Sequence, residues 1–188
     1  MLGSVVVRVV VFLAASAAIA WLSWRPLRDR RSHGFYRFFA FELLTGLILL
    51  NALAWFRDPL SARQMVSWTL GAASIGLAVE GFRVLRVVGR PGLAGSQGAN
   101  LGFENTTTLV TAGVYGLIRH PLYASLLALV WCAQLKDPFR IGSIALAVGA
   151  SGFLVATAVV EERENLARFG AAYAAYMKRT RRFIPFVF

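Results

Sequence analysis

The chain has 188 residues, of which 57% are hydrophobic and 15% are charged. Soluble domains carry a charged fraction of about 25%, so this composition excludes an ordinary soluble protein and indicates a polytopic membrane protein. The net charge of +11 would suit nucleic-acid binding. The basic residues, however, are confined to short stretches between apolar segments, which excludes a continuous basic face for nucleic acid.

Five apolar segments are long enough, or nearly long enough, to cross a bilayer as helices. In chain order they are about 5–24, 35–55, 65–88, 122–135 and 139–160. The fourth is short, and the polar turn Lys136-Asp137-Pro138 predicts a tight helical hairpin with the fifth. We therefore expect an all-α membrane helix bundle of about five transmembrane helices, with residues 1–188 forming a single membrane domain.

The longest polar stretch separates three N-terminal spans, in residues 1–88, from residues 89–188. Its first part is rich in glycine, but it has neither the lysine spacing nor the strand and helix context of a phosphate-binding loop. Beyond the fifth span, Leu166, Phe169, Tyr173, Tyr176 and Met177 recur at helical spacing. This pattern predicts an amphipathic C-terminal helix at the membrane surface.

The distribution of charge predicts the orientation in the membrane. Most of the 20 Lys and Arg residues fall in the first loop, the third loop and the C-terminal tail. By the positive-inside rule these parts face the cytoplasm, and the N-terminus lies outside. Arginines follow the first apolar segment instead of preceding it, so we expect a retained helix and not a signal peptide. Small size and an alanine- and arginine-rich composition favour a bacterial inner membrane.

Two acidic residues lie inside apolar spans, where an unpaired charge is costly. Glu80 has Arg83 one turn away on the same helix face, which favours a structural ion pair. Glu42 has no partner nearby in the sequence, and we regard it as a candidate for contact with a substrate.

A polar and aromatic constellation adjoins the last two spans. The run Arg119-His120-Pro121-Leu122-Tyr123 precedes the fourth span, and Glu161-Glu162 follows the fifth. Each part has a simpler explanation: a positively charged flank, a solvated helix end, and interfacial anchoring for Tyr173 and Tyr176. Their combined order at a membrane boundary nevertheless favours a functional site.

The constellation resembles a known family in two blocks. The first block is Thr107-Thr108-Leu109-Val110-Thr111-x-Gly113-Val114-Tyr115-x-x-x-Arg119-His120-Pro121-x-Tyr123. The second is Glu161-Glu162-x-x-x-Leu166-x-x-Phe169-Gly170-x-x-Tyr173-x-x-Tyr176, closing on Ile184-Pro185. Together they resemble the isoprenylcysteine carboxyl methyltransferase and phospholipid methyltransferase family of integral-membrane enzymes, over about residues 100–185.

The resemblance implies a methyltransferase that uses S-adenosylmethionine, with residues 89–188 as the cofactor-binding catalytic half. By matching positions, the cofactor would contact Asn100, Thr108, Leu109, Val110, Tyr115, Arg119, His120, Pro121, Leu122, Tyr123 and Glu161. The groups expected to position the acceptor or to remove its proton are His120, Tyr123 and Glu162. No metal centre is expected. Acidic, aromatic and apolar groups of this kind suit the ribose, the sulfonium and the adenine.

Two positions depart from the family pattern. Thr157 stands where prenylcysteine-specific members have an arginine for the substrate carboxylate, and Ser125 stands where a glycine is usual. A carboxylate substrate would lack its counter-ion in a low-dielectric site. We therefore expect a lipophilic acceptor with an amine, phenol or thiol nucleophile, ahead of a carboxyl group, on a lipid or other lipid-like small molecule.

Two other functions fit parts of the pattern. A membrane reductase of the sterol or enone type would use NADPH in a similar architecture, but five spans and an acidic pair favour a sulfonium donor. A non-enzymatic membrane protein on the same scaffold would bind neither cofactor.

Overall fold

The structure is a computed structural model, and it describes residues 2–89, 106 and 108–187. Six α-helices account for most of these residues, and no β-strand forms among them. The helices are α1 (Leu2–Leu22), α2 (His33–Leu50), α3 (Ala62–Val88), α4 (Pro121–Gln134), α5 (Ile141–Phe169) and α6 (Ala171–Arg179). The all-α prediction is therefore confirmed.

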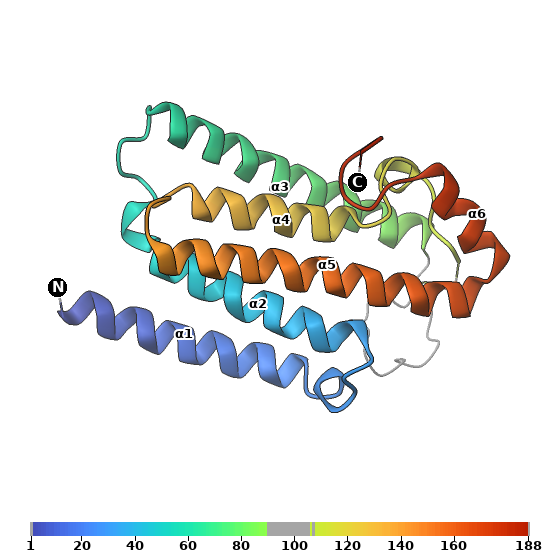
Figure 1. The fold of residues 1–188 in the computed structure, drawn as a ribbon, viewed down its shortest axis with the longest axis horizontal. Coiled ribbons are helices and arrows are strands. Elements are labelled where there is room, and N and C mark those ends of the chain that lie inside the picture. The colour runs from blue at the N-terminus through green and yellow to red at the C-terminus, as the bar shows by residue number, and fades with distance from the viewer. Residues whose placement is uncertain (1, 90–105, 107, 188) are drawn as a thin grey trace.

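The first five helices lie side by side as an elongated bundle (Figure 1). Helix α5 packs against α2 and α4, α3 packs against α4, and α1 packs chiefly against α2. Fully buried side chains such as Leu47, Val130 and Leu154 form the core between them. By contrast, α1 exposes large apolar side chains, with Val7 and Leu13 at 60% and 61%. Such a surface suits lipid and not water.

Helices α1, α2, α3 and α5 are long and apolar enough to cross a membrane. Helix α4 has 14 residues, which corresponds to about 21 Å and is shorter than a hydrocarbon core of about 30 Å. It joins α5 in the hairpin that the sequence predicts, and α3 covers its other side. Together the helices form a polytopic membrane bundle.

The C-terminal region differs from the prediction in one respect. Helix α5 continues to Phe169, well beyond the predicted end near residue 160, so Glu161 and Glu162 lie within it. The chain then turns at Gly170, whose φ of +54° is available to glycine without strain, and α6 begins. The expected single amphipathic helix is therefore divided, because Leu166 and Phe169 belong to α5.

A buried lysine closes the end of the bundle at which α4 meets α5. Lys136 is 1% exposed, and its Nζ donates to Gln64 Oε1 at 2.9 Å. The same ammonium lies 3.4 Å from the centre of the Trp68 ring and 5.1 Å from that of Trp55. Carbonyl groups at Leu135 and Lys136 accept from Arg63. Cation–π and hydrogen-bond contacts thus stabilise a charge that would be costly in this position.

We expect Lys136→Ala to lower the free energy of unfolding by about 2–4 kcal/mol, because it removes a desolvated cation–π contact and a buried hydrogen bond. Thermal unfolding in detergent measures the change. Arg140→Ala is the matched control, since Arg140 is a more exposed cation near the same turn, and it should cost less than about 0.5 kcal/mol. Equal unfolding temperatures for Lys136→Ala and the wild type would contradict a stabilising role for the Lys136 contacts.

Candidate active site

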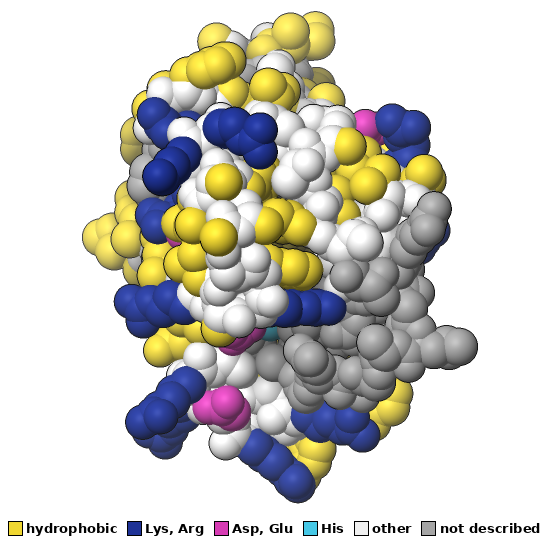
Figure 2. Space-filling view, turned by 90° about the vertical axis from the view of Figure 1, so that its right-hand side faces the viewer, with side chains coloured by type: hydrophobic (Ala, Val, Ile, Leu, Met, Phe, Trp, Pro, Cys, Tyr) yellow, Lys and Arg dark blue, Asp and Glu magenta, His cyan; other side chains and the backbone are white. Residues whose placement is uncertain are grey.

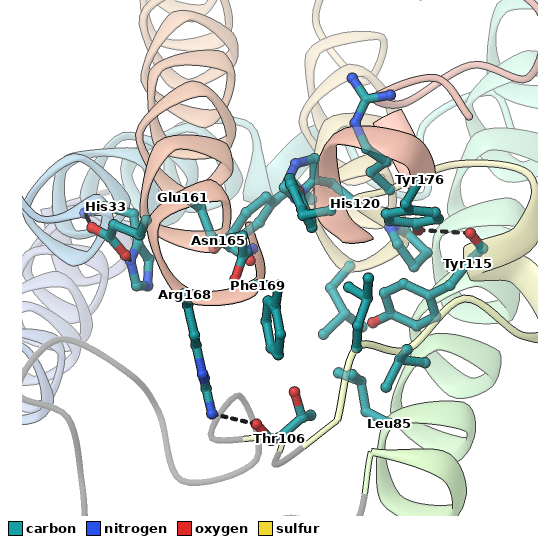
Figure 3. A pocket seen from close by; sticks show the side chains of 18 of the residues that line it. His33, Leu85, Thr106, Tyr115, His120, Glu161, Asn165, Arg168, Phe169 and Tyr176 are labelled. Atoms are coloured by element: carbon teal, nitrogen blue, oxygen red, sulfur yellow. Dashed lines mark hydrogen bonds and ion pairs between the residues drawn. The ribbon is translucent and has the colours of Figure 1, made fainter. Parts of the chain in front are cut away.

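A cavity of about 500 Å³ lies at the end of the bundle where α2 begins and where α3 and α5 end. This volume is within the range of small-molecule sites. Its walls come from the segment before α2, the ends of α3 and α5, the 3-10 helix at Gly113–Gly116, the start of α4, and α6. Figure 3 shows these side chains converging on one space.

Most of the predicted cofactor residues line this cavity, namely Leu109, Val110, Tyr115, Arg119, His120, Pro121, Leu122, Tyr123 and Glu161. Thr108 is not among the lining residues, and its hydroxyl donates to the carbonyl oxygen of Val88 at 3.3 Å. Asn100 lies outside the described residues. The two sequence blocks therefore meet in space, although they are about forty residues apart in the chain.

The start of α4 is joined directly to α5. Pro121 occupies the first turn of α4, where its missing N–H costs nothing, and His120 is the N-cap residue. The Tyr123 hydroxyl donates to Glu161 Oε2 at 2.6 Å. The His120 ring stacks on Tyr123 with the ring centres 5.5 Å apart. A histidine, a phenol and a carboxylate thus form one connected wall of the cavity.

Glu162 is the centre of a buried ion cluster. It is 3% exposed, and its Oε1 lies 2.7 Å from Arg119 Nε and 3.5 Å from His120 Nε2. Its Oε2 lies 2.8 Å from Arg182 Nη2. Glu162 does not line the cavity. Because both carboxylate oxygens already pair with arginines, this geometry favours an anchoring role for Glu162 over the removal of a substrate proton.

The residues after α6 run alongside the loop before α4, and we call residues 180–183 the C-terminal strap. The N–H groups of Arg119 and His120 donate to the carbonyl oxygens of Arg181 and Arg182 at 2.7 and 3.1 Å. Ile118 and Arg181 form a parallel bridge. The strap therefore fixes the backbone of two predicted site residues.

Tyr173 and Tyr176 on α6 are buried and line the cavity. The Tyr176 hydroxyl donates to the carbonyl oxygen of Tyr115 at 2.7 Å. Burial raises the pKa of both phenols, so they remain neutral near physiological pH. Their spacing in the sequence also fitted interfacial anchoring, but in the structure these rings close one side of the cavity.

A second wall of the cavity comes from residues that the sequence analysis did not assign to a site. The segment before α2 and the start of α2 contribute Arg25, Asp29, Ser32 and His33, and α5 contributes Glu164, Asn165 and Arg168. One available signal was the spacing of Glu161 and Glu164, which places both carboxylates on one face of a helix. The basic residues of the loop before α2 predict only the orientation in the membrane.

His33 and Glu164 form a close pair on this wall. His33 Nδ1 lies 2.6 Å from Glu164 Oε2. The backbone N–H of His33 donates to Glu164 Oε1 at 2.9 Å. The two contacts connect the start of α2 to α5 across 131 positions of sequence.

Basic side chains surround this end of the bundle, as the space-filling view onto it shows (Figure 2). The surface agrees with the excess of basic residues in the loops at this end. Among the residues described, no group of three or more His, Cys, Asp or Glu side chains is arranged to hold a metal ion.

The two acidic residues of the apolar spans lie outside the cavity wall. Glu80 pairs with Arg83 at 2.7 Å, which confirms the predicted structural ion pair. Glu42 accepts a hydrogen bond from the Ser16 hydroxyl of α1. Glu42 therefore connects two helices, and its position gives no support to a contact with substrate.

Comparison with known proteins identifies one relevant similarity. The chain is 26% identical over 178 residues to methanethiol S-methyltransferase 2 of Bradyrhizobium diazoefficiens. The match covers 89% of this chain and 64% of the relative, so the chain spans less than two-thirds of the length of that protein. No protein-family model matches the chain, and no solved structure matches it. The apolar helices indicate a membrane protein, and the chain is similar over most of its length to a methyltransferase.

We expect Glu162→Ala to lower the free energy of unfolding by about 3–5 kcal/mol, because it leaves buried cationic groups without their carboxylate. Limited proteolysis should also show earlier cleavage in the C-terminal strap. The control is Arg163→Ala, which alters an exposed neighbour on the same helix and should leave both measurements unchanged. Wild-type protection of the strap in Glu162→Ala would refute the anchoring role.

Proposed function

We propose that the protein is an integral-membrane methyltransferase that transfers a methyl group from S-adenosylmethionine to an apolar acceptor, with a thiol as the favoured nucleophile. The observation that carries the proposal is the cavity in which Glu161, Tyr123 and His120 meet the apolar residues before α4. The similarity to a methyltransferase supports the same chemistry.

The lining of the cavity fits the parts of this methyl donor. Glu161 provides a carboxylate acceptor suited to ribose hydroxyls. Leu85, Val110 and Leu122 provide apolar surface for an adenine ring. The aromatic faces of Tyr115, Tyr173 and Tyr176 suit a sulfonium cation, which is attracted to the π-system.

When bound, the donor would supply an activated methyl carbon, so the protein needs chiefly to position the acceptor and exclude water. Positioning of this kind contributes up to about 7–11 kcal/mol in favourable cases. Here the Tyr123–Glu161 bond, the stacked His120 ring and the C-terminal strap hold one wall in a fixed arrangement. We assign Glu162 to positioning of this wall.

The acceptor class follows from two observations. The Thr157 hydroxyl donates to the carbonyl oxygen of Phe153 at 2.7 Å and Thr157 is fully buried, so this position offers no cation to a carboxylate substrate. The relative is named for methyl transfer to methanethiol, a small thiol. An apolar thiol satisfies both observations, since it enters the site uncharged and becomes nucleophilic on loss of its proton.

We also propose that the end of the bundle with the cavity faces the cytoplasm and that the N-terminus lies outside, in an inner membrane. The ring of basic residues at this end supports this orientation by the positive-inside rule. Residues from both 1–88 and 89–188 line the cavity, which supports a single membrane domain in place of a separate catalytic half.

Calorimetry with purified protein in detergent tests the cofactor. We expect wild type to bind S-adenosylhomocysteine, and Glu161→Ala to weaken binding about 10- to 100-fold, because the variant removes a half-buried acceptor and the hydrogen bond from Tyr123. Asp137→Asn, at the opposite end of the bundle, is the control and should bind as wild type does. Binding of NADPH without S-adenosylhomocysteine would favour the reductase alternative, and binding of neither would favour a non-enzymatic protein.

A methyl-labelled donor tests the acceptor. Incubation with methanethiol, a long-chain alkanethiol or total membrane lipid should place label in an organic-extractable product, with the thiols giving the highest rates. Tyr123→Phe should reduce these rates, since it removes the bond that fixes Glu161. Label recovered only in water-soluble molecules would argue against an apolar acceptor, and label in lipid alone would replace the thiol with a lipid nucleophile.

A further inference from the structure

We infer that His33, oriented by Glu164, is the proton acceptor for the incoming nucleophile. The inference rests on the proposed methyl transfer and identifies a catalytic residue in the N-terminal half of the chain. It places the acceptor beside the second wall of the cavity, across from the residues that suit the cofactor.

The geometry of His33 is that of a histidine with a fixed tautomer. Glu164 Oε2 lies 2.6 Å from Nδ1, so the carboxylate holds the proton of the neutral ring on Nδ1. The lone pair is then on Nε2. Glu164 Oε1 accepts from the backbone N–H of His33 at 2.9 Å, which prevents the carboxylate from rotating away. The same carboxylate stabilises the imidazolium that forms when Nε2 takes a proton.

The position of His33 in the cavity separates it from the cofactor wall. Figure 3 shows His33 across the cavity from Tyr115 and Leu85, with Glu161 between them. Glu161 and Glu164 are three residues apart on α5, so one helix face presents one carboxylate to each wall. A methyl acceptor held between the two walls would therefore lie close to both carboxylates.

The other candidate bases are already committed to different contacts. The Tyr123 hydroxyl donates to Glu161, and Glu162 pairs with Arg119 and Arg182. His120 Nε2 lies 3.5 Å from the same Glu162 oxygen that pairs with Arg119.

Several charged groups line the cavity together with His33. Of the described residues, Glu164 and Arg168 come from α5, and Arg25 and Asp29 come from the segment before α2. Arg37 is buried one turn further along α2. Glu164 is the acid in direct contact with His33, at 2.6 Å.

The proton and electron balance of the step is simple. The carbon–sulfur bond of the product forms as the methyl–sulfonium bond of the donor breaks, and the electron pair of the broken bond remains on the donor sulfur. The thiol proton passes to Nε2 of His33 and is later released to solvent. A thiol and the sulfonium donor thus yield a methyl sulfide, S-adenosylhomocysteine and one proton.

His33→Asn tests this role, because it removes the base and retains the backbone N–H that donates a hydrogen bond to Glu164. With saturating methanethiol at pH 7, we expect kcat to fall about 100-fold or more, as removal of a general base usually does. The difference in kcat between wild type and His33→Asn should shrink as the pH approaches the pKa of the thiol, because the thiol then loses its proton without a base. It should also shrink at pH 7 when thiophenol, a more acidic thiol, is the acceptor. The dissociation constant of S-adenosylhomocysteine should stay within about threefold of wild type.

Two further variants complete the test. Glu164→Gln retains a hydrogen-bonding side chain without the negative charge, and it should show a smaller deficit with the same dependence on pH and on thiol acidity. Tyr36→Phe, on the same turn of α2, should match wild type in every measurement. A deficit in His33→Asn that is constant across pH and across both thiols would show a structural role and overturn the inference.

Full methanethiol activity of His33→Asn at pH 7 would also overturn the inference and leave the proposed methyl transfer intact. Failure of wild type to bind S-adenosylhomocysteine or to methylate any thiol would instead overturn the proposed function. The two failures are therefore distinguishable in one set of measurements.

Discussion

The arrangement of the cavity depends on one buried carboxylate. Glu162 pairs with Arg119 from the loop before α4 and with Arg182 from the C-terminal strap. Charges removed from water are stable only when they are paired and hydrogen-bonded, so these three segments must stay together. Their contact fixes His120 and directs Tyr123 toward Glu161. The wall proposed for the cofactor is thus a consequence of the ion cluster behind it.

Buried charges are stabilised in different ways at the two ends of the bundle. At one end, carboxylates and arginines neutralise one another around a cavity. At the other, Lys136 is enclosed by Trp68, Trp55 and Gln64. The difference agrees with the function that we propose, because Arg119 of the ion cluster and the neighbouring Glu161 line a cavity that can hold a ligand.

Much of the fold could be predicted because its signals are local. Apolar segments, the proline at the start of α4 and the Glu80–Arg83 spacing each need only a few neighbouring residues. The extension of α5 was missed because charged residues after position 160 suggest the end of a span, although a helix ends only where its backbone turns, here at Gly170. His33 could not be found locally, since its partner Glu164 is 131 residues away.

The shortness of α4 has a consequence for how an acceptor arrives. A helix of 14 residues is about 9 Å shorter than the hydrocarbon layer, and the cavity begins at its first residues. In the orientation that we propose, with the turn between α4 and α5 at the opposite surface of the bilayer, the cavity would lie below the plane of the lipid headgroups. Molecules that dissolve in the acyl chains are enriched there by about 0.8 kcal/mol for each methylene group. In the function that we propose, the bilayer would therefore concentrate apolar nucleophiles close to the cavity, even when their concentration in water is low.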